Sequence, residues 1–101
     1  MELSDFKGTC TFGEAIEAMK DGKRVTREGW NGKNMFLWLI EAAEVKREWM
    51  REPGLIAACG DKESLRCGPS VRIKDADGTV ITGWLASQTD MFAEDWFILE
   101  D

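Results

Sequence analysis

Apolar residues recur at helical spacing from Phe12 onward and predict a first helix over residues 12–20. Thr11 precedes this stretch and Glu14 follows three residues later, which is the spacing of a capping box. Gly22 comes just after the last turn and is typical of a helix end, because glycine accepts left-handed backbone.

Two strands are predicted after this helix. Residues 23–27 form a short candidate strand, and residues 28–33, which contain two glycines, predict a turn. Residues 34–40 are apolar on both alternating faces. A strand of this kind lies at the centre of a sheet or is covered by another subunit.

A hairpin is predicted towards the C-terminal end. Residues 71–74 alternate between apolar and basic side chains, residues 75–78 have the turn composition Asp-Ala-Asp-Gly, and residues 79–82 return as a second strand. Residues 89–94 can hold one helical turn, and residues 96–99 predict a final strand.

The middle of the chain changes character. Residues 41–52 are rich in Ala, Glu, Lys and Arg, with an apolar stripe, and predict an amphipathic helix. Residues 55–59 are apolar, but their pattern does not decide between helix and strand. Residues 60–69 are polar, with two glycines and a proline, and predict a loop.

These elements together predict an α+β fold in one domain, residues 1–101. We expect an antiparallel sheet of about four to five strands, packed with the N-terminal helix and a second helix. No apolar run approaches the roughly 20 residues of a membrane span. The N-terminus is acidic and lacks the apolar core of a signal peptide, so we expect a cytoplasmic protein.

Charge and cysteine content narrow the possible partners. The formal net charge of −6 disfavours nucleic acid polymers and anionic membranes as partners, although a pocket can still hold a small phosphate-bearing ligand. The three cysteines lack C-x-x-C spacing and histidine is absent, which disfavours a zinc site and indicates reduced thiols. No cofactor-binding motif is present, so we expect no cofactor and no metal.

Two segments place a tryptophan directly after a glycine and crowd small polar residues beside it. They are Thr26 to Lys33 and Gly83 to Met91. Glycine permits sharp bends and close approach, and an indole offers a flat stacking face with one N–H donor. This combination suits a small, partly aromatic ligand such as a nucleotide. The alternative is that both tryptophans are core anchors beside turns.

The candidate site draws its polar groups from the same two segments. A carboxylate such as Asp90 can accept from ribose hydroxyls or an exocyclic amine. Individual residues have simpler alternatives, since Ser87 and Asp90 also have the spacing of a capping box and Arg27 could be a solvated strand residue. The candidate ligand-binding residues are Arg27, Trp30, Asn31, Trp84, Ser87, Gln88, Thr89 and Asp90.

Catalysis is the weaker interpretation of these residues. Nucleophilic catalysis of the Ser-His-Asp or Cys-His type lacks its base, because the chain has no histidine. Acid–base work by a carboxylate pair among Asp90, Glu94 and Asp95 remains open. Acidic residues at this density are more often solvated or helix-capping.

Several segments resemble one small phage and prophage family, formerly catalogued as a domain of unknown function and now named for the second type of Thoeris anti-defence protein. The stretch from Trp84 to Met91, Trp-Leu-Ala-Ser-Gln-Thr-Asp-Met, is the most specific. The other matching segments are Phe12 to Ile16, Val25 to Lys33, Met35 to Leu37, Asp75 to Val80 and Glu94 to Trp96.

The resemblance implies a non-enzymatic sponge. Members of the family bind the cyclic ADP-ribose-type signal made by the bacterial Thoeris TIR-domain protein, and some also take up cyclic dinucleotides. They assemble as homotetramers with ligand pockets where protomers meet. By motif position, Trp30 and the polar residues after Trp84 are carried over as pocket residues.

Residues 41–69 match no pattern of the family and are expected to form a variable insert. Two other functions stay open beside the sponge. The chain could be a structural or protein-binding phage module in which Trp30 and Trp84 bury against a partner, or a small enzyme that cleaves cyclic nucleotides.

Overall fold

The computed structural model describes residues 9–30 and 34–100 and confirms the α+β fold. The α-helices are α1 (Phe12–Lys20), α2 (Pro53–Cys59) and α3 (Gln88–Phe92), and the 3₁₀ turns are η2 (Glu28–Trp30) and η3 (Arg47–Trp49). The strands are β1 (Arg24–Arg27), β2 (Phe36–Ile40), β3 (Ala43–Lys46), β4 (Ser64–Cys67), β5 (Ser70–Lys74), β6 (Val80–Thr82) and β7 (Trp96–Leu99).

Five strands form one antiparallel sheet in the order β6-β5-β2-β1-β7. The strand that is apolar on both faces, β2, lies at its centre, as the sequence predicts. Helix α1 begins at the predicted capping box, in which Thr11 Oγ1 accepts from Glu14 N and Glu14 accepts from Thr11 N.

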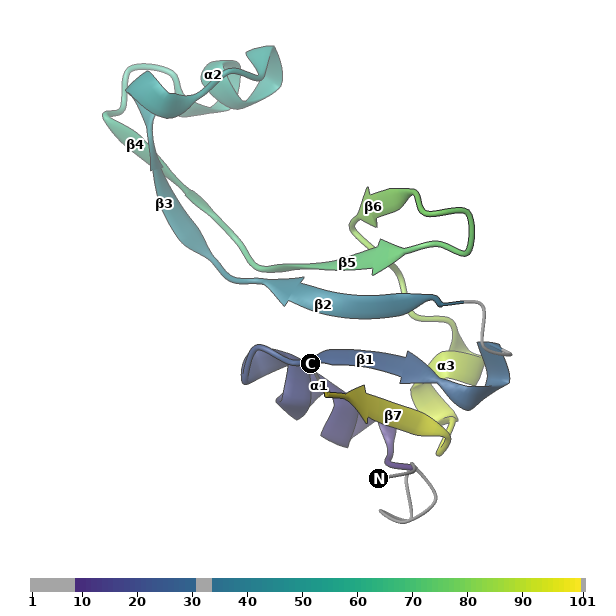
Figure 1. Cartoon of the computed structure of the whole chain (residues 1–101). Helices are drawn as coiled ribbons and strands as arrows, with labels where there is room; N and C mark the ends of the chain where they lie inside the picture. The colour runs from purple at the N-terminus through teal and green to yellow at the C-terminus, as the bar shows by residue number, and fades with distance from the viewer. Residues whose placement is uncertain (1–8, 31–33, 101) are drawn as a thin grey trace.

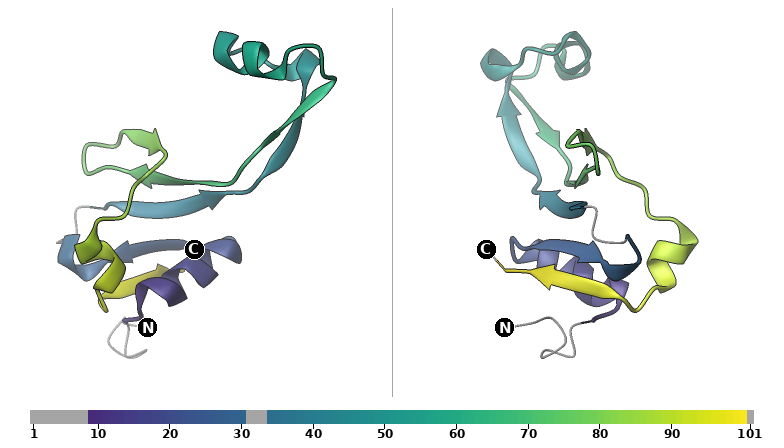
Figure 2. Two further views of the ribbon diagram at one scale, coloured as in Figure 1. Left: turned by 180° about the vertical axis from the view of Figure 1, so that it is seen from behind. Right: turned by 45° about the vertical axis from the view of Figure 1, so that its right-hand side comes forward.

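The core lies between α1 and one face of this sheet (Figure 2). The antiparallel register puts the same-facing residues of four strands in one row under the helix: Ile98, Val25, Leu37 and Ile73. Val25 and Leu37 are fully buried. The fully buried Trp96 also faces this side, so the sheet has a packed face and an opposite, open face.

A narrow arm, residues 43–67, extends away from the sheet (Figure 1). It consists of the β3–β4 ribbon with η3 and α2 at its far end, and it gives the molecule extents of 53 × 27 × 26 Å. We call the rest, with the five-stranded sheet, α1 and α3, the body. In the arm, only Met50 and Cys59 are buried among the described apolar residues.

The arm continues a hairpin that starts in the body. In both the β2–β5 ladder and the β3–β4 ladder, the two residues of each pair lie equally far from Leu55 in the sequence. The two ladders therefore share one unbroken register. The ladder is interrupted where Pro69, which has no N–H to donate, faces the β2–β3 junction.

The predicted amphipathic helix over residues 41–52 is wrong, because β3 and η3 occupy this stretch. Local composition favours helix there, but pairing with β4 overrides this preference. The predicted loop over residues 60–69 is wrong in part, since it contains β4. The second helix of the fold instead falls on the undecided residues 55–59, where Pro53 starts α2.

Three further sequence predictions for the body are confirmed, whereas the predicted turn over residues 28–33 lies partly outside the described residues. The helix over residues 12–20, the hairpin around residues 75–78 and the short helical turn before the last strand are all present. None of the helices in residues 9–30 and 34–100 has the length and apolar character needed to cross a membrane.

Candidate functional site

The two Gly-Trp segments meet in space at a cluster of four aromatic rings, which we call the aromatic cluster: Phe12, Trp30, Trp84 and Trp96. Trp96 is fully buried at its centre. Trp30 and Trp84 are half-buried and contact each other edge to face, with ring centroids 6.4 Å apart. Edge-to-face contact is the favoured geometry of such pairs. Both rings also contact Trp96, at 5.5 and 6.3 Å.

Gly29 sets the position of Trp30 by allowing a carboxylate to come very close to the backbone. Its N–H donates to Asp95 Oδ2 at 2.8 Å, and a Cβ on Gly29 would lie 2.9 Å from the same oxygen. Only glycine fits there without displacing the carboxylate. The bend of the first segment is therefore fixed by a residue 66 positions away.

Gly83 shapes the second segment in a different way. Its φ of +91° is a conformation that side-chain-bearing residues rarely adopt. This bend lets the N–H groups of Gly83 and Trp84 both donate to the carbonyl of Val71, each at 2.9 Å. The bend ties Trp84 to β5 and brings it onto the core.

Arg27 lies at the end of β1 between two carboxylates that it bonds directly. Its Nη1 donates to Asp90 Oδ1 at 2.8 Å, and its Nε donates to Asp95 Oδ1 at 2.8 Å. Its side chain is only 13% exposed, so the interpretation of Arg27 as a solvated strand residue is wrong. The guanidinium also lies 5.9 Å from the ring of Trp96 and covers part of the aromatic cluster.

Both carboxylates are held in the ionised form. The hydrogen bond from Arg27 lowers the pKa of Asp95, with help from the N–H of Gly29. Burial acts to raise the pKa of Asp90, but hydrogen bonds from Ser87 and Arg27 outweigh burial and lower it. The same partners raise the pKa of Arg27, Asp95 most of all.

Ser87 and Asp90 form a capping box. This is the simpler of the two interpretations given above, capping and ligand binding. The backbone N–H of Asp90 donates to Ser87 Oγ at 3.1 Å, while Ser87 N and Oγ donate to Asp90 Oδ2 at 3.0 and 2.8 Å. Asp90 therefore takes part in capping the first turn of α3 and binds Arg27 with the same carboxylate. Its carbonyl also accepts from Trp96 Nε1 at 3.0 Å.

The structure thus brings together most of the predicted site residues, with unequal roles. Arg27 and Ser87 each form hydrogen bonds with Asp90, and these three residues support the rings of the aromatic cluster. Gln88 and Thr89 are exposed on the first turn of α3, next to this network. Asn31 lies outside the described residues.

Two residues that organise the site were not among the predicted ligand-binding residues. Asp95 joins Arg27 to Gly29, and Trp96 forms the centre of the aromatic cluster. The sequence indicated Asp95 only as one of a possible carboxylate pair for acid–base work and as part of the matching segment Glu94 to Trp96. The contact of Asp95 with Arg27 spans 68 positions, so no local pattern could reveal it.

The two carboxylates of the site already serve as hydrogen-bond acceptors within the chain. The ionised Asp90 and Asp95 have no proton to give, and their oxygens already accept hydrogen bonds. Within residues 9–30 and 34–100, no group of three or more His, Cys, Asp or Glu side chains could hold a metal ion.

Comparison with known proteins gives the class of this chain. The family model of the Thoeris anti-defense 2-like domain matches residues 10–99, a span that includes residues 41–69. The chain is also 39% identical over 100 residues to Thoeris anti-defense 2 of Bacillus phage SP01, and the alignment covers 92% of this chain and 98% of that relative. Fold and match together define a small anti-defence domain. The chain belongs to the Thoeris anti-defense 2-like family.

Proposed function

We propose that this protein binds and sequesters a cyclic ADP-ribose-type immune signal and so blocks bacterial anti-phage defence without catalysis. Membership of the Thoeris anti-defense 2-like family supports the anti-defence role. Capturing a signal requires tight binding and abundance rather than a catalytic group.

The observation that carries this proposal is the pair of half-buried rings, Trp30 and Trp84, in one cluster, together with the exposed polar side chains of Gln88 and Thr89 on the first turn of α3. A partly exposed indole can stack on an adenine base, and base stacking on an aromatic ring contributes roughly 1–3 kcal/mol. The amide of Gln88 and the hydroxyl of Thr89 can donate to and accept from ribose and phosphate groups.

The Arg27–Asp90–Asp95 network supports a binding role because it makes the site rigid. Two carboxylates on one guanidinium fix the end of β1, the start of α3 and the bend at Gly29 relative to one another. A site held in place before the ligand arrives loses less entropy on binding. Arg27 and Asp90 therefore act in this proposal mainly as supports of Trp30 and Trp84.

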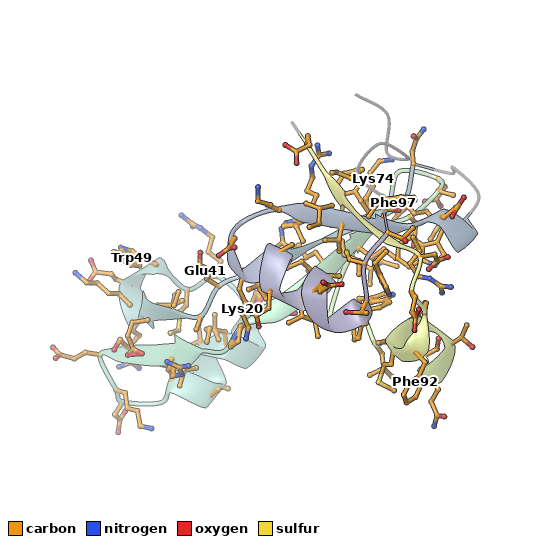
Figure 3. All side chains as sticks on the ribbon, turned by 90° about the horizontal axis from the view of Figure 1, so that it is seen from below. Lys20, Glu41, Trp49, Lys74, Phe92 and Phe97 are labelled. Carbon is orange, nitrogen blue, oxygen red and sulfur yellow. The ribbon has the colours of Figure 1, made fainter. Side chains whose placement is uncertain are left out.

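We propose further that the protein works as a homo-oligomer, a tetramer, in which a neighbouring subunit completes the site. The apolar side chains of Leu85, which follows Trp84, and of Phe92, at the end of α3, are 89% and 80% exposed. Figure 3 shows Phe92 on the outer side of α3. Large apolar side chains left this exposed mark a surface for another protein. The same observation favours a second candidate function, a protein-binding phage module.

Calorimetry of the pure protein against cyclic ADP-ribose isomers and cyclic dinucleotides tests the proposal. We expect saturable heat with at least one cyclic ADP-ribose isomer. Heating the complex should then return the ligand intact to the supernatant, whereas an enzyme would return cleaved product. Absence of heat with every compound at micromolar protein would contradict the sponge and leave the protein-binding module.

A further inference from the structure

The short turn η2, which carries Trp30, is held at its start by a residue from the other end of the chain. The main-chain carbonyl of Asp95 accepts from Glu28 N at 3.0 Å, and its carboxylate oxygen Oδ2 accepts from Gly29 N at 2.8 Å. The first N–H groups of a helical turn have no partner within the turn. Asp95 therefore supplies both of the partners that the start of η2 lacks.

Asp95 also ties this turn to its surroundings. The other oxygen of its carboxylate, Oδ1, accepts at 2.8 Å from Nε of Arg27, the residue just before η2. The next residue along the chain, Trp96, is fully buried and pairs with Cys10 through its own N–H and carbonyl, at 3.1 and 2.7 Å. Trp30 packs against the ring of Trp96. Two adjacent residues therefore hold the turn and the ring that supports it.

The two carboxylates that share Arg27 hold different parts of the site. Asp90 accepts from Arg27 and, with its other oxygen, from Ser87 at the start of α3. None of its contacts within the described residues reaches η2. Asp95 bonds the same guanidinium and the turn that carries Trp30. The position of Trp30 therefore depends directly on Asp95 and only indirectly on Asp90.

The orientation of Trp30 matters because stacking requires a ring that lies flat against a base. The ring plane of Trp30 lies at 75° to that of Trp84 and at 77° to that of Trp96, so it stands nearly perpendicular to both. A rotation of η2 would tilt this half-buried ring away from a bound base. A ring that is ordered before the ligand arrives also loses less entropy on binding.

We propose that Asp95 is a positioning residue for ligand binding, which sets the affinity of the aromatic cluster by fixing Trp30 and does not itself contact the signal molecule. This role rests on the proposed function and adds to it the residue that holds the stacking ring. An amide in place of the carboxylate has one acceptor oxygen and one donor nitrogen. Asparagine at this position can therefore accept from Arg27 or from Gly29, but its two ends cannot serve both.

A double-mutant cycle measured by calorimetry with the cyclic ADP-ribose isomer that gives heat tests this role. Asp95→Asn should raise Kd at least about threefold, and by no more than Trp30→Ala does, because it acts through that ring. In the Trp30→Ala background, Asp95→Asn should change Kd by less than about twofold. A residue with a merely structural role would weaken binding by the same factor in both backgrounds, and that result would overturn the proposal.

Glu94→Gln is the matched control, since it removes a neighbouring carboxylate that is exposed and has no contact among those described. It should leave Kd unchanged, and a loss equal to that of Asp95→Asn would overturn the proposal in favour of a general effect of charge. If the unaltered protein binds no isomer, the proposed function fails and this role falls with it. Saturable heat with an unchanged Kd in Asp95→Asn would overturn the role of Asp95 alone.

Hydrogen exchange of the ligand-free protein gives a second measurement, one that does not depend on binding. Relative to the amides of β2, which report global stability, the Gly29 amide should exchange at least about tenfold faster in Asp95→Asn than in the unaltered protein, because its acceptor is weakened or lost. Glu94→Gln should leave this ratio unchanged. An unchanged ratio in Asp95→Asn would show that η2 is held without Asp95 and would overturn the proposal.

Discussion

The body and the arm of this protein are built from one continuous hairpin but are stabilised differently. In the body, helix α1 covers β1, β2 and β7 and buries Trp96 and Leu37 completely. In the arm, the two-stranded ribbon β3–β4 buries only Met50 and Cys59 among its described apolar residues and leaves Trp49 58% exposed. An isolated two-stranded ribbon is marginally stable in water. A shared strand register therefore does not give two regions equal stability.

The largest effect should come from removing the central ring of the body. Trp96→Ala deletes a fully buried indole and its hydrogen bond to the Asp90 carbonyl, and should lower the free energy of unfolding by about 3–5 kcal/mol. Trp49→Ala, at the far end of the arm (Figure 3), should change it by less than about 0.5 kcal/mol. Urea denaturation of both variants measures this, and equal losses would show that the arm carries as much stability as the body.

The next largest effect should come from the carboxylate that joins Arg27 to Gly29. Asp95→Ala leaves the 13%-exposed guanidinium with one partner and should cost about 2–3 kcal/mol. Glu44→Ala removes an exposed carboxylate from the arm, one that accepts only from Ser64 Oγ among the contacts described, and should cost less than about 0.5 kcal/mol. Thermal unfolding of the two variants distinguishes them, and an Asp95 variant as stable as the Glu44 variant would show that the network stabilises nothing.

Acid should weaken the body through the same network. The pKa values of Asp90 and Asp95 are lowered in the folded protein, so their stabilising contribution is complete above the unfolded value of about 3.9 and is lost as pH falls through the folded values. Unfolding measured in urea from pH 7 to pH 2.5 should show this loss below about pH 4. Asp95→Asn should make that decline shallower; an unchanged slope would assign acid sensitivity to other groups.

A smaller difference in stability should distinguish alanine substitutions at two glycines. Gly29→Ala places a methyl group 2.9 Å from Asp95 Oδ2 and 3.2 Å from Arg27 Nη2 and should cost about 1–2 kcal/mol. Gly54→Ala in α2 meets nothing within 4 Å and should be neutral or stabilising by up to about 1 kcal/mol. Differential scanning calorimetry resolves the two, and a neutral Gly29→Ala would mean that Asp95 can move away.

Sequence patterns predict the body well because its elements carry local signals. The capping box at Thr11, the turn at residues 75–78 and the double-faced strand β2 each result from neighbouring residues. The arm was mispredicted because Ala43 to Lys46 becomes a strand only through its partner β4. Local helix propensity cannot anticipate a pairing that the register of β2 and β5 imposes.

The same limit applies to the site. Sequence patterns identified the two Gly-Trp segments, and the structure brings them together at one aromatic cluster. They could not show that Arg27 is bonded to Asp90 and Asp95, because these contacts span 63 and 68 positions. For Ser87 and Asp90 the local signal was ambiguous between capping and ligand binding, and the structure shows the capping contacts.

The central proposal is that the aromatic cluster of the body holds the signal molecule. Calorimetric titration of Trp30→Ala and Trp49→Ala with the cyclic ADP-ribose isomer that binds the unaltered protein tests it most directly. Trp30→Ala should raise Kd by roughly 5- to 150-fold, the equivalent of one lost stacking contact, with the far-ultraviolet circular dichroism spectrum unchanged. Trp49→Ala should leave Kd as it is. The account would be contradicted if Trp49→Ala weakened binding and Trp30→Ala did not.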